Sequence, residues 1–205
     1  MEFHVPGPVR SLKDFFVHLG IVTLGILIAL GLEQIVEAHH RVKIGHESVA
    51  SFRHELAENR DHVNEVLASL PHVHEQIQAQ IARITALGDA PPRSGVPIQP
   101  PSLRYDFLST AAWDTAIATQ ALNYIPEADA RRYSESYTAF RLFMDEERGG
   151  LAIWQELHGF GTDAAALTPE QRRSLIQQLQ RYDGYASVLA VVGRGTLAAC
   201  ERALQ

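Results

Sequence analysis

Residues 15–32 read FFVHLGIVTLGILIALGL, a run of 18 positions that contains no Asp, Glu, Lys or Arg. An α-helix rises about 1.5 Å per residue, so a helix of this length spans about 27 Å, close to the roughly 30 Å hydrocarbon core of a bilayer. Charged residues stand on both sides of the run. The stretch therefore predicts a transmembrane helix over residues 15–36, preceded by a short leader over residues 1–14.

The order of charges and apolar residues is also that of a cleaved secretory signal. Arg10 and Lys13 precede the run, and Ala29-Leu30-Gly31 resembles a small-x-small cleavage site. The run is longer than the roughly 7–15 apolar residues of such signals, and its helical pattern continues into residues 33–42. These features favour an uncleaved signal anchor. A leader this short favours a C-terminal domain outside the cytoplasm, although positive charges are nearly balanced across the span.

Small residues interrupt the apolar surface of the predicted span. Gly25 and Ala29 are four residues apart, and Gly20 and Gly31 add further gaps. Such residues let two helices approach closely in lipid, so these four are candidate transmembrane packing residues. Glycine is also common in transmembrane helices generally, which explains them without a partner.

Composition limits the classes of function. The formal net charge is −6 and the isoelectric point is near 5.9, which argues against a nucleic-acid surface because such a surface needs a basic stripe. One cysteine, Cys200, has no partner for an internal disulfide. The roughly 170 residues beyond the span are enough for one domain with a substantial core.

A heptad repeat continues beyond the span. With Val42 at an a position, 11 of the 14 a and d positions from Val42 to Leu87 are apolar. This seam predicts a membrane-proximal helical rod over residues 37–88, with residues between the seam positions, such as Glu55 and Glu58, on the solvated face. The candidate seam residues are Val42, Val49, Phe52, Leu56, Asn59, Val63, Val66, Leu70, Ile77 and Ile84.

Two residues of the rod have more than one interpretation. Pro71 removes a backbone donor, and because the heptad register survives it, we expect a kink rather than two separate helices. Asn59 occupies a d position. It either sets register and oligomeric state in a coiled coil, or lies at the edge of an intramolecular bundle, bonded to a side chain or water.

The rest of the chain reads as a linker followed by helices. Five prolines in residues 90–101 predict an extended Pro-rich linker over residues 89–101, and a helical bundle domain over residues 102–205 follows. Its expected helices are Ser102 to Asn123, Pro126 to a break at Gly149-Gly150, residues 151–159, and Pro169 to about Arg202, the last begun by a capping box at Thr168.

No alternating strand pattern is found. The fold class is all-α: an N-terminal transmembrane helix that continues into a long amphipathic rod, packed with a bundle of three to four further helices.

The sequence carries no catalytic motif. Seven of the ten histidines fall between His39 and His74, but their spacing spirals around a helix instead of meeting at one point, which is typical of a solvated face. Ser109 is not part of a G-x-S-x-G motif. We therefore predict no catalytic residue, no cofactor and no metal ligand.

Two segments resemble a group of uncharacterised bacterial membrane proteins. Residues 25–30, GILIAL, followed by Glu33, Glu37 and Arg41, resemble the single hydrophobic helix that begins those proteins. Residues 110–126, which contain Trp113, resemble their later Trp-containing segment. The residues after Glu37 depart from the pattern, since relatives tend to have an aromatic there. The resemblance implies a bacterial inner-membrane location and no particular activity.

We expect a non-enzymatic, single-pass inner-membrane protein whose helical domain binds protein. Its partners would be the lipid bilayer and either a second copy or another subunit of a membrane complex, with no nucleic acid. One alternative is an extracytoplasmic sensory or ligand-binding bundle in which Trp113 and Tyr124 line a pocket. A second alternative is a metal-dependent enzyme built on the histidine-rich rod.

Overall fold

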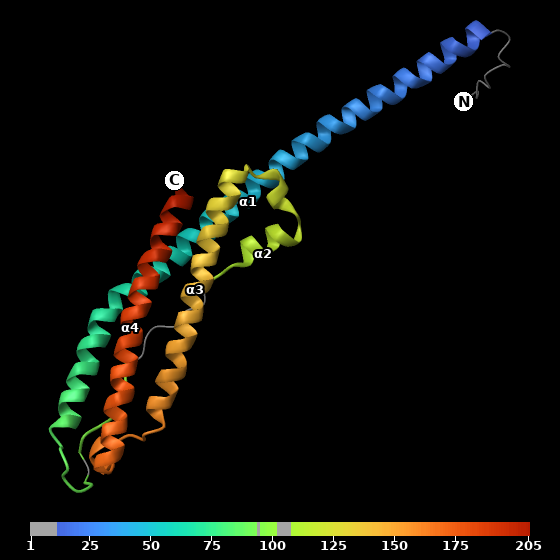
Figure 1. Ribbon diagram of the computed structural model, residues 1–205. Helices are drawn as coiled ribbons and strands as arrows, with labels where there is room; N and C mark the ends of the chain where they lie inside the picture. The colour runs from blue at the N-terminus through green and yellow to red at the C-terminus, as the bar shows by residue number, and fades with distance from the viewer. Residues whose placement is uncertain (1–11, 94, 102–107) are drawn as a thin grey trace.

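Four α-helices and two short 3-10 helices form the part of the chain that the computed structural model describes, residues 12–93, 95–101 and 108–205 (Figure 1). These elements are α1 (Leu12–Thr85), α2 (Ala111–Ala118), η1 (Ala121–Tyr124), α3 (Glu127–His158), η2 (Ala164–Ala166) and α4 (Pro169–Leu204). The same residues contain no strand, only an isolated bridge between Pro97 and Asp163. The all-α prediction is confirmed.

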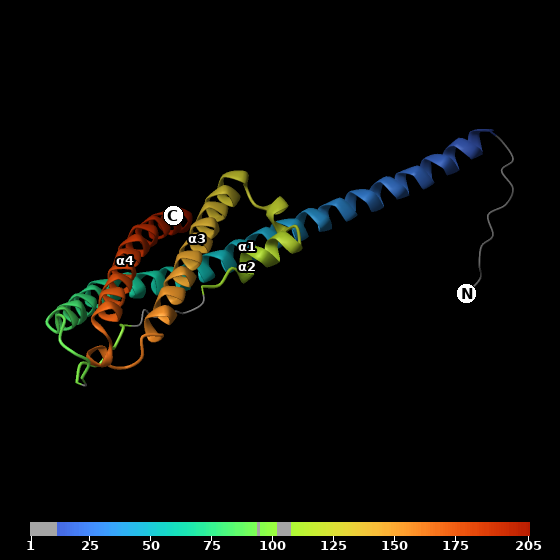
Figure 2. The same ribbon diagram turned by 60° about the horizontal axis from the view of Figure 1, so that its bottom comes forward.

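α1 is a single helix of 74 residues, about 110 Å long at the usual helical rise. Its first half projects away from the molecule, and its second half lies along α3 and α4, as both views show (Figures 1 and 2). The predicted span and the predicted rod are therefore one continuous element. Continuity across Pro71 is confirmed, since the helix runs through it. α1 bends between its blue and green parts (Figure 1), and a kink at Pro71 itself stays a prediction.

The core is formed by α1, α3 and α4, three long helices packed side by side. α3 runs parallel to the second half of α1, and α4 returns antiparallel to both, so that the C-terminus lies near the end of the bundle where α1 enters (Figure 1). The largest fully buried side chains come from all three helices: Phe52, Leu56, Ile77 and Ile84 of α1, Tyr137, Phe140, Phe143 and Leu157 of α3, and Leu175, Leu179, Tyr182 and Leu189 of α4.

The predicted break at Gly149-Gly150 is wrong. α3 continues through both glycines to His158, and the expected short helix over residues 151–159 is its last part. A Cβ at Gly150 would overlap the ring of Tyr185 on α4, whereas one at Gly149 would make an ordinary 3.6 Å contact with that ring. Gly150 is present because an aromatic ring packs directly on the helix backbone, a role that sequence does not distinguish from a helix stop.

The Pro-rich segment is extended, as predicted, but it packs on the bundle. The backbone N–H of Ile98 donates to the carbonyl of Thr162 at 2.9 Å, and that of Ala164 donates to Val96 at 2.7 Å. The Asp163 carboxylate accepts the N–H groups of Gly95 and Val96 at 2.8 and 3.0 Å. These donors hold the pKa of Asp163 below its usual range. The segment thus closes the far end of the bundle.

Arg172 holds the same end together from the inside. Its side chain is buried, and its guanidinium donates to four carbonyl oxygens, those of Gly88, Ala90, Ala164 and Ala165, at 2.9 to 3.2 Å. The planar fork of an arginine suits this task because it offers five donors in fixed directions. One side chain therefore ties the end of the rod, the Pro-rich segment and η2 to the first turn of α4.

The expected helix from Ser102 to Asn123 is shorter than predicted. Residues 102–107 lie outside the described part, Leu108–Thr110 is not helical, and α2 begins at Ala111. Gln120 then takes a positive φ of 58°, which ends α2 before η1. The start of α4 agrees with prediction: Thr168 and Gln171 form the capping box, each side chain bonding the other's backbone N–H at 3.2 and 2.9 Å.

Candidate interaction site

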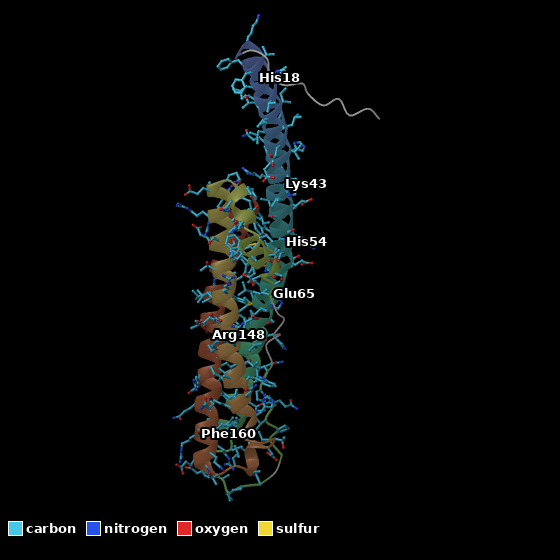
Figure 3. The ribbon with its side chains drawn as sticks, turned by 90° about the vertical axis from the view of Figure 1, so that its right-hand side faces the viewer. His18, Lys43, His54, Glu65, Arg148 and Phe160 are labelled. Atoms are coloured by element: carbon cyan, nitrogen blue, oxygen red, sulfur yellow. The ribbon has the colours of Figure 1, made fainter. Side chains whose placement is uncertain are left out.

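Among the described residues, no element covers the first half of α1. Residues 15–43 are all exposed. Along α1, Ile44 is the next residue and is half-buried, and Gly45 is buried. Figure 3 shows the helix bare between His18 and Lys43, and flanked by other helices at the level of His54 and Glu65. Among the described residues, α1 is the one helix long and apolar enough to cross a bilayer. We call residues 33–43, between the apolar run and the bundle, the stalk.

The predicted span-packing residues all face open space in a single chain. A Cβ added at Gly20, Gly25 or Gly31 would meet no atom within 4 Å, and Ala29 is exposed. Nothing in the chain's own fold therefore requires a small residue at these positions. Whether they pack against another helix stays a prediction.

The heptad seam lies where the bundle covers it. Phe52, Leu56, Asn59, Val63, Val66, Leu70, Ile77 and Ile84 are buried, while Val49 is half-buried and Val42 is exposed. From Phe52 onward the seam is covered by the chain's own residues, mainly those of α3 and α4, so this part offers no surface to a second copy. The only seam residue left open is at the stalk.

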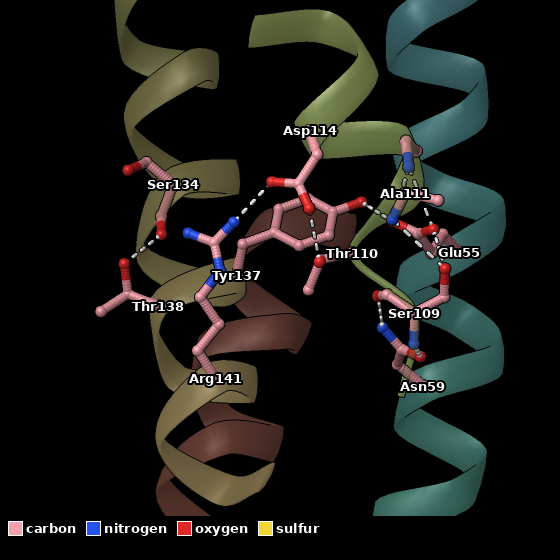
Figure 4. A network of polar contacts seen from close by, with 11 residues as sticks. Glu55, Asn59, Ser109, Thr110, Ala111, Asp114, Ser134, Tyr137, Thr138 and Arg141 are labelled. Atoms are coloured by element: carbon pink, nitrogen blue, oxygen red, sulfur yellow. Dashed lines mark hydrogen bonds and ion pairs between the residues drawn. The ribbon is translucent and has the colours of Figure 1, made fainter. Parts of the chain in front are cut away.

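Glu55 is buried at the point where α1, α2 and α3 meet, and the expectation that it lies on the solvated face is wrong. Its carboxylate accepts the hydroxyl of Tyr137 at 2.7 Å, the hydroxyl of Ser109 at 2.5 Å and the backbone N–H of Ala112 at 3.1 and 3.2 Å (Figure 4). Because Ala112 is in the first turn of α2, the carboxylate also meets the positive end of that helix dipole.

These donors satisfy the oxygens of a carboxylate that lies in the interior of the protein. A buried carboxylate needs several hydrogen bonds to replace its hydration, and Glu55 has them from three elements. Burial and the neighbouring Glu55 raise the pKa of Tyr137 above its usual range, so its hydroxyl remains a donor. The arrangement holds the membrane-proximal elements in place, and all donors are committed within the protein.

Asn59, one turn further along α1, also bonds the segment before α2. We call Glu55 and Asn59, with their hydrogen bonds to residues 109–112, the clamp. Its amide donates to the carbonyl of Ser109 at 2.7 Å, and the N–H of Ser109 donates back to its side-chain oxygen at 2.9 Å (Figure 4). Of the two interpretations of Asn59, the structure supports the intramolecular one. These two bonds also occupy the backbone groups of Ser109, which explains why α2 begins later than the sequence predicts.

Trp113 belongs to the core rather than to a pocket. Its ring stacks on Tyr137 with centroids 5.2 Å apart and lies 5.6 Å from the ring of Phe52. Tyr124 is partly exposed, and its backbone carbonyl lies directly against Gly45. An added Cβ at Gly45 would overlap that oxygen, which explains a glycine at this d position.

A shallow groove of about 360 Å³ does lie nearby, between α1 and α2. Its lining is mostly small or hydroxylated, and the one charged residue is Glu47. The lining residues are Ile44, Glu47, Ser48, Ser51, Ala111, Ala112, Thr115, Ala116, Thr119 and Ala121. It opens beside the stalk, on the part of the bundle nearest the apolar run.

The histidines are spread along α1 and pair with different acids. His74 lies 2.7 Å from Asp183, His54 lies 3.5 Å from Glu58, and His62 lies 3.6 Å from Glu147. In the described residues no three His, Cys, Asp or Glu side chains come together as a metal site would require.

Sequence reasoning missed the buried charges. Glu55 and Arg172 look like surface residues because their neighbours along the helix are charged. The one available signal for Glu55 was its position next to a seam residue, Leu56, which places it at the edge of the covered face. No protein-family model matches the chain, and no curated protein and no solved structure matches it either.

Proposed function

We propose that the chain is a non-enzymatic, single-pass protein of the bacterial inner membrane that binds another protein next to the bilayer. Its bundle would lie outside the cytoplasm, and its partner would be a second copy or another subunit of a membrane complex. The observation that carries this proposal is α1, which is unbroken from the apolar run to the far end of the bundle.

The length of the stalk supports a positioning role. Gly45, the first residue of the described part that is buried, comes 13 residues after Leu32, so the stalk holds the bundle about 20 Å from the end of the apolar run. A flexible tether would need no helix, whereas a helix fixes both distance and orientation. Buried Glu55, Asn59 and Arg172 support the same role, because their hydrogen bonds hold separate elements of the chain together.

Two measurements test the proposal. Reporters fused at each end of the chain should place the C-terminus outside the cytoplasm, and chemical crosslinking in intact membranes should give a discrete adduct of the full chain. A cytoplasmic C-terminus contradicts the orientation. A protein that stays a strict monomer with no adduct contradicts the binding function.

The groove between α1 and α2 favours a second candidate, an extracytoplasmic ligand-binding bundle. Its volume is within the range of small-molecule sites, though it is shallow. A ligand seated there would stabilise the folded state by mass action. Thermal unfolding of the full chain across a ligand panel should then show a stabilising hit that Thr115→Trp abolishes, and a panel without any hit argues against this candidate.

A further inference from the structure

An apolar row runs along the uncovered part of α1. It consists of the a and d positions upstream of the bundle: Leu24, Ile28, Gly31, Ile35, Ala38 and Val42. We call it the stalk row. Leu24, Ile28, Ile35 and Val42 are between 56 and 68% exposed. It continues the same heptad register that the bundle buries from Phe52 to Ile84.

Within the stalk, apolar residues are concentrated in the row and charged residues lie outside it. Within residues 33–43 every a and d position is apolar, and all the charged side chains, Glu33, Glu37, Arg41 and Lys43, lie at other positions. Outside the row the stalk has one large apolar residue, Val36. Contact with lipid explains the apolar residues up to Leu32. It does not explain why Ile35, Ala38 and Val42, which follow Leu32 in the stalk, lie on one face of the helix.

We propose that the stalk row is covered by the stalk row of a second copy of this chain, in a parallel dimer centred on Gly31. The inference rests on the proposed function and names its partner. Two copies inserted in one bilayer have the same orientation and the same depth, so each residue of the row meets its own counterpart. β-branched residues at three of the a positions, Ile28, Ile35 and Val42, favour two strands in a parallel pairing.

Charge is compatible with this pairing. Glu33 and Glu37 lie on the side of α1 away from the row, and Glu37 is already paired with Arg41 of its own chain at 2.9 Å. Two copies therefore meet without a carboxylate facing a carboxylate. This matters in a chain whose formal net charge is −6.

The bundle sets the upper limit of the contact. Tyr124 of η1 packs on Gly45, which occupies the next d position of the same face. A partner helix cannot follow the face past this point, so the two helices must cross and diverge toward their bundles. The glycine at position 31 suits the crossing point, because small residues permit the closest approach of helices in lipid. Of the four predicted packing residues, Gly31 alone is in the row.

Cysteine crosslinking in native membranes tests this proposal. Single cysteines at Gly31, Ile35 and Ala38 should form disulfide-linked dimers on mild oxidation, while cysteines at Glu33, Glu37 and His40 serve as matched controls from the opposite side of the stalk. The native Cys200 is buried and gives no background. Crosslinking confined to the row supports the dimer, and equal crosslinking around the helix overturns it because random collision gives that result.

A substitution in the span provides the second measurement. Gly31→Ile should lower the yield of the Ile35→Cys dimer roughly tenfold by blocking close approach, and Ala29→Ile, off the row, should not. Neither change disturbs a single chain, since both positions are uncovered. Absence of any crosslink in protein that resists alkaline extraction overturns the dimer and leaves the proposed function standing. Protein released by alkaline extraction contradicts the membrane anchor and so the proposed function itself.

Discussion

Single side chains hold distant segments of this chain together. Glu55 and Asn59 fix residues 109–112 to α1, and Arg172 fixes the Pro-rich segment to α4. Each is charged or polar, each is buried, and each forms hydrogen bonds to backbone atoms of another segment. Because the alternative to these bonds is an unsatisfied group in a dry interior, their removal costs more than the bonds themselves contribute.

Glu55→Ala should destabilise the bundle by about 3 kcal/mol, because it leaves the Tyr137 hydroxyl and the Ala112 N–H without an acceptor. Glu55→Gln should cost less, since its amide oxygen still accepts. Urea unfolding of the full chain in detergent, followed by tryptophan fluorescence, measures both. Glu58→Ala, one turn on and exposed, is the control and should be nearly neutral. Equal effects of Glu55→Ala and Glu58→Ala would show that the clamp contributes nothing.

Cys200 should resist thiol reagents in the folded protein. Burial raises its pKa to about 11, so little thiolate forms near neutral pH, and its sulfur is inaccessible against the carbonyl of Leu56. Maleimide labelling at pH 7 should be slow in the native protein and complete in denaturant. Fast native labelling would mean that α1 and α4 separate readily at this level.

At the scale of elements, the sequence predicted long helices well and their junctions poorly. The seam of α1 and the capping box of α4 follow from local periodicity and local hydrogen bonds, which a sequence displays directly. The continuation of α3 through Gly149 and Gly150 depends on a ring from α4, which is far away in sequence. The late start of α2 likewise depends on Asn59 and Glu55 from α1. These features are set by tertiary contacts, which periodicity does not contain.

The two adjacent glycines of α3 should respond in opposite directions to alanine. Gly149→Ala should stabilise the bundle by about 0.5–1 kcal/mol, because alanine loses less entropy in a helix and its Cβ makes only an ordinary contact. Gly150→Ala should destabilise it by about 1–3 kcal/mol, because the new Cβ overlaps the Tyr185 ring. Thermal unfolding by circular dichroism measures both. Stabilisation by both substitutions would show that the ring moves aside freely.

Arg172→Lys should loosen the far end of the bundle while the rest of the molecule stays folded. Lysine keeps the charge but cannot direct donors to four carbonyls at once. Limited proteolysis should then cut within residues 89–101 at least about tenfold faster, because local opening of that segment becomes easier. Arg173→Lys, whose arginine is exposed beside Asp89, should leave the cleavage rate unchanged. An unchanged cleavage rate in Arg172→Lys would show that the guanidinium of Arg172 is not needed to hold residues 89–101 in place.

At the scale of the whole molecule, one helix carries both an exposed apolar run long enough to cross a bilayer and a face buried in the bundle. The apolar run needs no partner in lipid, and the far half of α1 has its partners in α3 and α4. The stalk between them lies outside the apolar run, and its residues are exposed, not packed on α3 or α4. A helix of about 11 residues is too short to be stable alone in water, so the stalk depends on being anchored at both ends and on whatever covers its apolar row.

The unbroken helix is the central claim, and a distance across the stalk tests it most directly. Nitroxide labels at Glu33 and Glu58, both exposed, are 25 residues apart along α1, which corresponds to about 38 Å in a continuous helix. Pulsed electron paramagnetic resonance on the full chain in bilayers, diluted with unlabelled protein to suppress contacts between copies, should give one narrow distribution near that distance. A broad distribution, or one centred well below about 38 Å, would show that the helix breaks in the stalk and would contradict the account.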